Sequence, residues 1–430
     1  MDSKLISILK DDANVRAFYQ PILALDTHQI MGYEVLGRIK SGSKFKSLGP
    51  FFTNPSISLN EQLRVDLLIR NHAFSYFVQN PSANKLFVNI KPSWMFRSYQ
   101  ESGDMFTLRL LERYGIPPSS IVIEVTEDDF RGSIEELQSF VEKYREKGCL
   151  IAIDDIGTGS SNIDRIVRIK PNFLKADIYM MKKSAYDFGY LGALRSISML
   201  ADQIGAALLI EGVETREDLR RAISIGAHYV QGFLFSQVKS RFQSEDKYAA
   251  LIKKEINTYR EQVITEERLW WQMCRMLIDR LQLQELASFE VDAINENDDV
   301  MQLRPEDRFI DQRLTHMNEC CLRVYICSAS GEQRSSNFVR NANNHWIRKP
   351  EFQGINWSWR PNFIAGLLAG EGQRKVVLSD SYSDLDSKKI IRTLFVTLEH
   401  GIIFLIDIDV ISARAVFPSL DSMEVTNSTE

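Results

Sequence analysis

The chain has 430 residues, a formal net charge of −5 at pH 7, 44% hydrophobic residues and 25% charged residues. This composition is typical of a globular protein, and the length exceeds what one core supports, so we expect two or three domains, or a barrel with an added module. The acidic balance argues against binding to a nucleic acid polymer. A phosphate-bearing ligand would instead be held locally by metal ions, a few Arg or Lys side chains and backbone amides.

Targeting and cysteine signals are weak. No apolar stretch reaches the roughly 18 residues that cross a bilayer, and the N-terminal MDSKLISILKDD becomes acidic too early for a signal peptide, so we expect a cytoplasmic protein with no membrane span. Five cysteines without CxxC spacing indicate neither a disulfide framework nor a zinc site. The adjacent Cys320 and Cys321 are most simply packing residues.

Residues 1–243 alternate strand-like and helix-like segments. A hairpin-like pair, RAFYQPILAL and IMGYEVLGRI, comes first, with a turn signal from Asp26 to Gln29. Later apolar runs are separated by amphipathic stretches, such as the one that places Leu137, Phe140 and Tyr144 on one face. This alternation predicts an α/β domain with enough units to close a TIM-like (β/α)8 barrel, whose first strand is irregular.

Polar residues end the apolar runs of this segment. In chain order they are Asn89, Glu124 and Glu127, Asp154 and Asp155, Lys175 and Asp177, Glu211 and Glu214, and Gln231. The C-terminal ends of parallel strands meet on one face, so these side chains are expected to be neighbours. Gathered acids repel each other unless cations bind between them, which favours a site for hard divalent metal ions. For any single acid a helix cap is the simpler interpretation, but the whole set is harder to explain in that way.

Residues 244–290 are predicted to form a helical linker. The sequence from Ser244 to Leu286 contains no Pro or Gly and carries an apolar stripe that includes Tyr248 and Ile252. Such a helix needs a packing partner, and we favour a homodimer contact over a purely intrachain one. Trp270 and Trp271 are expected to anchor the helix rather than to bind a ligand.

Residues 291–430 are predicted to form an α+β regulatory domain. Four strand-like runs, LRVYICSASGEQRSSNF, KVVLSDSYSDL, KIIRTLFVTL and IIFLIDIDV, suggest an antiparallel sheet, and NWSWRPNFIAGLL suggests a helix. Trp357, Trp359, Arg360 and Tyr382 could line a pocket for an unknown ligand, although plain core packing is the simpler interpretation.

Several motifs together resemble the EAL-domain family. They are YEVLGR, VNIKP, IEVTE, IDDIGTGSSN, LKAD, IEGVE and QGFLF, which occur in the family's order within the first 243 residues. Members are cyclic-di-GMP phosphodiesterases, or silent binders derived from them. The whole architecture resembles the YkuI type of EAL protein, whose C-terminal module is PAS-like.

The resemblance implies a site with two Mg²⁺ or Mn²⁺ ions. Positions that match the metal ligands of the family are Glu34, Asn89, Glu124, Asp154 and Asp155. Lys175 matches a lysine that contacts the attacking water or a phosphate oxygen, and Glu211 matches a glutamate that is either a metal ligand or the general base. Together with Glu34, these two are the expected catalytic residues.

Substrate and loop residues follow from the same resemblance. Those expected to bind the dinucleotide are Gln20, Leu36, Arg38, Pro92, Asp177 and Gln231. Those expected to stabilise the loop after Asp155 are Glu127, Gly157, Thr158 and Gly159. Departures from the family pattern are Val35, Ile156, Ser160, Asn162 and Val238, of which only the three in the loop bear on the chemistry.

Every ligand position is retained, so we expect a phosphodiesterase that converts cyclic-di-GMP to linear pGpG. One alternative is a silent cyclic-di-GMP receptor that signals through the linker helix, which the altered loop favours. A more distant alternative is a TIM-barrel metalloenzyme that acts on a sugar phosphate.

Overall fold

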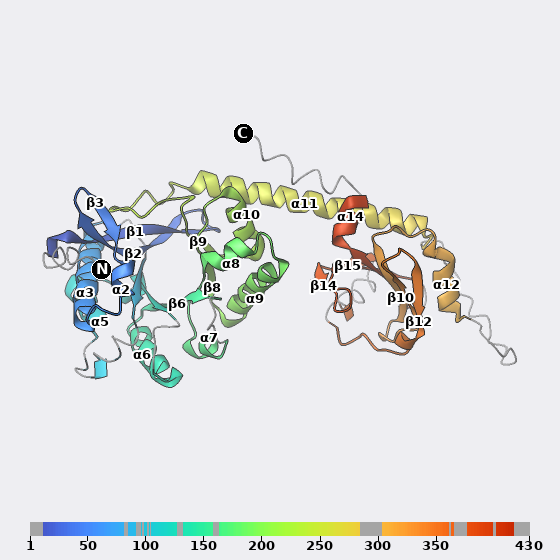
Figure 1. The fold of residues 1–430 in the computed structure, drawn as a ribbon, viewed down its shortest axis with the longest axis horizontal. Helices are drawn as coiled ribbons and strands as arrows, with labels where there is room; N and C mark the ends of the chain where they lie inside the picture. Colours follow the sequence, from blue (N-terminus) through green and yellow to red (C-terminus); the bar gives the residue numbers. More distant parts are fainter. Residues whose placement is uncertain are drawn as a thin grey trace. The chain divides into compact units, whose positions relative to one another are not determined.

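The computed structural model describes residues 12–80, 85–91, 96, 99–100, 103, 105–126, 132–157, 163–283, 303–360, 363–364, 376–398 and 401–416. Figure 1 labels its helices and strands. Two compact units make up the chain, Met1–Arg260 and Glu261–Glu430, and the boundary between them falls within one long helix. The division into segments 1–243, 244–290 and 291–430 stays a prediction.

The first unit is a closed eight-stranded barrel. Its strands are β1 (Val15–Ala24), β2 (Ile30–Ser41), β4 (Leu86–Ile90), β5 (Ile121–Thr126), β6 (Leu150–Ile156), β7 (Phe173–Ala176), β8 (Ala207–Ile210) and β9 (Tyr229–Val230). Neighbours from β2 through β9 are parallel, whereas β1 runs antiparallel to both β2 and β9 and closes the ring. The predicted TIM-like barrel with an irregular first strand is therefore confirmed. A short strand, β3 (Lys44–Ser47), extends the sheet beside β2.

Helices connect the strands of the barrel. They are α2 (Gly49–Phe52), α3 (Leu59–Gln79), α5 (Phe106–Tyr114), α6 (Ile134–Glu146), α7 (Ile163–Ile169), α8 (Ile178–Lys183), α9 (Phe188–Ile204) and α10 (Arg216–Ile225). Reciprocal capping boxes start two of them, with Ser133 before α6 and Thr215 before α10. In α6 the predicted apolar face is confirmed, because Leu137, Phe140 and Tyr144 are all buried.

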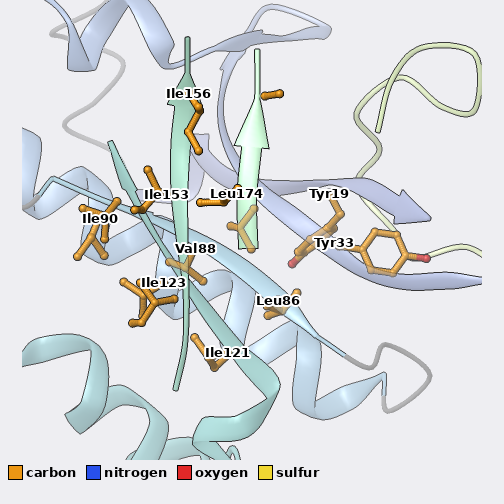
Figure 2. Close-up of a cluster of buried hydrophobic side chains, with 14 of the residues drawn as sticks. Tyr19, Tyr33, Leu86, Val88, Ile90, Ile121, Ile123, Ile153, Ile156 and Leu174 are labelled. Carbon is orange, nitrogen blue, oxygen red and sulfur yellow. The ribbon is translucent and has the colours of Figure 1, made fainter. Parts of the chain in front are cut away.

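Two apolar layers build the barrel, since alternate residues of a strand point to opposite faces. The outer layer, between strands and helices, includes Leu86, Val88, Ile121 and Ile123 (Figure 2). The inner layer consists of Ile22, Phe87, Val122, Ala152, Phe173 and Leu209, all buried. Because the inner layer fills the barrel, any cavity for a ligand must lie beyond it, towards the ends of the strands.

The predicted linker is the helix α11 (Ala249–Arg280). Its first turns belong to the barrel unit, where Ile252 is buried and the carboxylate of Glu255 lies 3.5 Å from the guanidinium groups of Arg216 and Arg220. Its later turns belong to the second unit, where Trp270 and Cys274 are buried in the core. Each end of the helix thus contributes to a hydrophobic core.

The second unit is built on an antiparallel sheet. Its strands are β10 (Cys321–Ser328), β11 (Asn337–Arg340), β12 (Trp346–Lys349), β13 (Val376–Leu378), β14 (Tyr382–Ser383), β15 (Ile390–Thr397) and β16 (Ile402–Asp409). The order is β12-β11-β10-β16-β15-β13, with β14 beside β15. One face packs on α11 and α12 (Pro305–Leu314), and α14 (Val410–Val416) follows β16. The predicted antiparallel sheet is confirmed, while most of the predicted helix in NWSWRPNFIAGLL lies outside the described residues.

The described residues bear on the expectations about a membrane span and about the cysteines. None of the helices in that part of the chain is long and apolar enough to cross a membrane. All five cysteines are buried with free thiols, and Cys320 and Cys321 lie in the hydrophobic core of the second unit.

Candidate functional site

A ring of polar side chains lies directly beyond the inner apolar layer of the barrel. We call it the polar ring, and its members are Gln20, Glu34, Asn89, Glu124, Asp154, Lys175, Glu211 and Gln231. Most members follow an inner-layer residue by two positions, as Asn89 follows Phe87, Glu124 follows Val122, Asp154 follows Ala152, Lys175 follows Phe173 and Glu211 follows Leu209. The two-residue period of a strand therefore places these polar groups on the barrel axis.

Lys175 lies at the centre of the acidic part of the polar ring. Its ammonium nitrogen is 2.7 Å from Glu124 Oε1, 3.0 Å from Asp154 Oδ1 and 2.7 Å from Glu211 Oε1. Lys175 and Glu124 are both fully buried. A single cation thus faces three carboxyl groups that belong to three different strand ends.

The electrostatics of this cluster follow from burial and mutual charge. Burial alone would lower the pKa of Lys175, but Asp154, Glu124 and Glu211 together raise it well above its ordinary value. Desolvation raises the pKa of Glu124 well above its usual range, although Lys175 opposes the shift. Glu211 keeps 23% of its side chain accessible, yet desolvation among the other acids raises its pKa to about 8. The cluster therefore holds a charged lysine and carboxyl groups that favour protonation unless more positive charge joins them.

Glu34 is fixed by two amide side chains. Asn89 Nδ2 donates to Glu34 Oε1 at 3.0 Å, and Gln231 Nε2 donates to Glu34 Oε2 at 2.6 Å. Gln231 Nε2 also lies 3.1 Å from Gln20 Oε1, so β1, β2, β4 and the end of β9 meet at this point. The amide groups orient the carboxylate without neutralising its charge.

A bulge at the end of β6 presents Asp154 and Asp155 together. The register between β6 and β7 shifts between Ile153 and Ile156, and Asp155 has a left-handed backbone with φ of +58°. Asp155 N donates to Asp154 Oδ1 at 3.0 Å, while desolvation and the charge of Asp154 raise the pKa of the solvent-accessible Asp155 to about 6. Gly157 follows with φ of +101°, a conformation that glycine adopts readily.

A cavity of about 410 Å³ adjoins the polar ring. Leu36, Arg38, Asn89, Lys91 and Asp155 are among the residues that line it. Arg38 is half-buried and donates to the carbonyl of Gly37 at 3.0 Å. A cationic guanidinium, a carboxylate and an apolar wall thus border one cavity, which suits a ligand with phosphate groups and flat bases.

Of the remaining predicted site residues, only Asp177 lies within the described part of the chain. Asp177 caps α8, because its carboxylate accepts a hydrogen bond from Tyr179 N at 3.1 Å. Pro92, Glu127, Thr158 and Gly159 fall outside the described residues, as do Ser160 and Asn162. For Asp177 the cap interpretation is thus the one that the hydrogen bond supports.

The sequence analysis did not identify Arg70, which holds the backbone of Asn89, a member of the polar ring. This fully buried side chain of α3 forms an ion pair with Asp66 and donates to the backbone carbonyl of Asn89 at 3.1 Å. Arg70 Nη1 also donates a hydrogen bond to the hydroxyl oxygen of Thr107. The signal available in the sequence was an Asp and an Arg four residues apart within an apolar helix face, but the contact with Asn89 cannot be read from that spacing.

The donor chemistry of the ring suits a hard divalent cation, since all five predicted ligands offer oxygen atoms. The Oε1 atoms of Glu124 and Glu211 have the Lys175 ammonium at ion-pair distance, and Glu124 Oε2 accepts no hydrogen bond within the described part of the chain. Across those same residues, no three acidic, histidine or cysteine side chains are arranged so that they could hold a metal ion as they stand. A metal ion bound by these acids would compete with Lys175 for their oxygen atoms.

Comparisons with known proteins identify the families that the two parts of the chain match. Residues 6–238 match the family model described as EAL domain, and residues 246–412 match the one described as EAL-domain associated signalling protein domain. The uncharacterized EAL-domain containing protein YkuI of Bacillus subtilis (strain 168) is 33% identical over 406 residues, which are 94% of this chain and 96% of YkuI.

A solved structure of the same YkuI protein and one further relative carry ligand or activity information of their own. The crystal structure of Bacillus subtilis YkuI in complex with c-di-GMP and calcium matches with a TM-score of 0.82 and 31% identity, over 95% of this chain and 99% of that one. The cyclic di-GMP phosphodiesterase RocR of Pseudomonas aeruginosa is 28% identical over 236 residues, which are 53% of this chain and 58% of RocR.

Proposed function

Because this chain belongs to the EAL-domain family, we propose that it binds cyclic-di-GMP and hydrolyses one phosphodiester bond to give linear pGpG. The observation that carries the proposal is the buried contact of Lys175 with Glu124, Asp154 and Glu211 at the mouth of the barrel. Dense negative charge beside the 410 Å³ cavity is useful for chemistry only if cations join it, as they do in a metal-assisted phosphodiesterase.

We propose that Glu34, Asn89, Glu124, Asp154 and Asp155 hold two Mg²⁺ or Mn²⁺ ions. When bound, such ions polarise the phosphate and lower the pKa of an attacking water. The amide contacts of Asn89 and Gln231 keep Glu34 oriented before any ion arrives. The bulge at Asp155 places a second aspartate beside Asp154. In a regular strand the residue after Asp154 would point to the opposite face of the sheet.

We assign substrate binding and proton transfer to side chains of the protein. Arg38 pairs with a phosphate of the dinucleotide in the 410 Å³ cavity, and Leu36 contacts a base. Lys175 directs its ammonium group to the water or to a phosphate oxygen. Desolvation raises the pKa of Glu211 to about 8, so Glu211 would accept the proton of that water once bound cations had lowered this pKa and ionised the carboxyl group.

A second candidate function is a cyclic-di-GMP receptor without hydrolysis. The observation that favours it is that Lys175 already lies within 3.0 Å of all three acids and offsets part of their negative charge. In that case residues 291–430, which we propose to be a PAS-like regulatory module, and the linker helix transmit occupancy of the barrel. We propose that the chain acts as a homodimer in either case.

One assay separates the two functions. Purified protein is incubated with cyclic-di-GMP, with and without Mn²⁺, and the nucleotides are separated by chromatography. Appearance of pGpG only with Mn²⁺ supports the phosphodiesterase, whereas stoichiometric binding without pGpG over hours supports the receptor. Absence of binding would overturn both proposed functions and would leave a metalloenzyme that acts on a sugar phosphate as the remaining alternative.

Two variants assign the roles. Glu34→Ala is expected to abolish turnover while nucleotide affinity remains, because Arg38 still contacts the phosphate. Arg38→Ala is expected to weaken binding by about tenfold or more, which is the value of one charge-assisted contact. Glu112→Ala, which removes an exposed carboxylate on α5, is the matched control and should behave as the wild type.

A further inference from the structure

A second cavity, of about 520 Å³, lies within the C-terminal unit. We call it the sheet cavity. Its floor is formed by Tyr325, Tyr382, Thr393, Phe395, Leu405 and Asp407 of the sheet. Trp357, Trp359 and Arg360 border it from the segment that follows β12. None of these residues takes part in the function proposed for the barrel.

Asp407 places a carboxylate at the floor of the sheet cavity. It is 1% exposed and lies on β16, in which the residues from Ile402 to Leu405 are all apolar. Thr393 Oγ1 donates to Asp407 Oδ1 at 2.8 Å. Arg323 lies 3.2 Å from Asp407 Oδ2 without hydrogen-bond geometry, so within the described chain this oxygen accepts no hydrogen bond. A buried acceptor of this kind is costly unless a donor reaches it, and because the oxygen has almost no accessible surface, a ligand donor reaches it only when the side chains that cover it shift.

Arg323 cannot also serve an incoming anion. Its Nη2 lies 3.1 Å from Asp384 Oδ2 and 3.3 Å from Asp386 Oδ2, and its Nη1 faces Asp407. Three carboxylates therefore surround this one guanidinium. Its positive charge is already offset by groups of the protein.

Arg360 is in the opposite situation. Its guanidinium stacks over the ring of Trp357, 4.4 Å from the ring centroid, and lies 5.4 Å from the ring centroid of Trp359. In the part of the chain that the structure describes, this guanidinium forms no ion pair at contact distance and makes no side-chain hydrogen bond; burial raises the pKa of Asp407, and the charge of Arg360 across the cavity opposes that rise. Two indole rings thus hold a planar cation at the rim of the cavity, where Trp359 is 70% exposed.

The sheet cavity consequently has two distinct poles and an aromatic middle. We propose that it binds a small aromatic acid, whose carboxylate pairs with Arg360 and whose hydroxyl or amine group donates to Asp407. The ring of the ligand packs against Tyr325, Phe395 and Trp357. The cavity is within the size range of small-molecule sites, and one aromatic ring with two polar ends fills it only partly, so larger aromatic acids also fit.

A matched series of probes tests the chemistry of both poles. The intact chain is titrated calorimetrically with 4-hydroxyphenylacetate, with phenylacetate, which lacks the donor, and with 4-hydroxyphenylacetamide, which lacks the charge. We expect 4-hydroxyphenylacetate to bind, and the amide to bind at least about tenfold more weakly because a charge-assisted contact is lost. Phenylacetate should also bind more weakly, since it leaves the Asp407 oxygen without a donor.

Two variants localise the site. Arg360→Gln is expected to reduce affinity for 4-hydroxyphenylacetate by about tenfold or more while the melting temperature without ligand stays near that of the wild type. Arg334→Gln, which removes an exposed arginine of the same unit outside the cavity, should bind as the wild type does. Equal affinity for acid and amide, no binding of the acid at millimolar concentration, or an equal effect of both variants would each overturn the proposal.

Discussion

The ammonium nitrogen of Lys175 lies 2.7 Å from Glu211 Oε1, so the two side chains form an ion pair at the mouth of the barrel. Since Lys175 also contacts Glu124 and Asp154, the charge balance of the polar ring depends on this one side chain. Removal of one partner of a buried ion pair leaves the remaining charges desolvated and repelling one another. Lys175 therefore links the stability of the barrel to its proposed chemistry.

The first prediction concerns the substitution Lys175→Met. We expect the free energy of unfolding to fall by about 3–5 kcal/mol without metal, because three buried acids lose their cation. Added Mn²⁺ should recover part of that loss, since it supplies positive charge to the same acids. Turnover of cyclic-di-GMP should fall roughly 10²–10³-fold, the usual effect of removing one preorganised electrostatic group. Urea unfolding with and without Mn²⁺, and the chromatographic assay, measure these effects.

Lys253→Met is the control for this experiment, because Lys253 is exposed on α11. It should leave both the unfolding free energy and the turnover unchanged. If Lys175→Met were as stable as the wild type in the absence of metal, the acids would not depend on the lysine for their charge balance. The assignment of Lys175 to the centre of the site would then be wrong.

The second prediction concerns Gly157, which follows the bulge that carries Asp155. Its φ of +101° is unfavourable for any other residue, and a Cβ built there would also meet the side chain of Met180. Met180 is flexible enough to move, so the backbone strain is the lasting cost. We expect Gly157→Ala to destabilise the barrel by about 1–3 kcal/mol and to weaken Mn²⁺ binding, because Asp155 is displaced.

Gly192 provides the contrast for that test. It lies inside α9, and the space that an added methyl group would occupy is open, so Gly192→Ala should stabilise the protein by up to about 1 kcal/mol. Thermal melts and Mn²⁺ titrations of both variants make the comparison. A Gly157→Ala protein with wild-type stability and metal affinity would show that the loop does not constrain Asp155.

The positions of the polar ring were predictable from the sequence because a strand repeats every two residues. Once Val122 and Ala152 are assigned to the barrel interior, Glu124 and Asp154 must follow them there. The mutual contacts were not predictable in the same way. Nothing local indicates that Lys175 bridges three strand ends or that Arg70 supports Asn89, since both contacts depend on how distant segments pack.

Asp155 and Asp177 show a different limit of the sequence. Regular alternation would direct Asp155 away from Asp154, and only a bulge with a left-handed residue brings them together. By pattern alone Asp177 is more simply a helix cap, and its expected role in binding the dinucleotide came from the family resemblance. The hydrogen bond to Tyr179 N supports the cap, because an acid just before a helix satisfies a free backbone N–H group.

The third prediction concerns the pH dependence of the C-terminal unit. Asp409 precedes α14, accepts hydrogen bonds from Ile411 N and from Ser412 Oγ, and lies 2.9 Å from Lys389 Nζ. Burial would raise its pKa, but Lys389 and Ser412 outweigh burial and hold the pKa below its ordinary value. A lowered folded-state pKa means that the stabilisation is complete above the unfolded value near 4 and is lost as pH falls through the folded pKa.

Asp409→Asn tests this sign. At pH 6 the substitution should lower the free energy of unfolding by about 1 kcal/mol, the value of a good helix cap with an ion pair. The difference from the wild type should shrink as the pH falls below about 4, where the wild-type carboxylate itself becomes protonated. Asp380→Asn, at an exposed position, should show no such pH-dependent difference. A wild-type advantage that grows towards low pH would contradict the assignment.

The last prediction concerns the two adjacent tryptophans of α11. Trp270 is buried in the core of the C-terminal unit, whereas Trp271 is 40% exposed, so only the first anchors the helix within its own unit. Ile264 lies seven residues before Trp271, on the same face, and is also exposed. Apolar side chains at this spacing on a helix surface are suited to a partner helix, and burial of each would contribute about 1.5–3 kcal/mol.

We therefore expect a homodimer in solution that Trp271→Glu dissociates without unfolding the unit. Gln272→Glu introduces the same charge about 100° around the helix and should remain dimeric. Light scattering coupled to size exclusion measures the mass of each variant, and a monomeric wild type, or a Trp271→Glu protein that stays dimeric, would assign this apolar face no role in assembly.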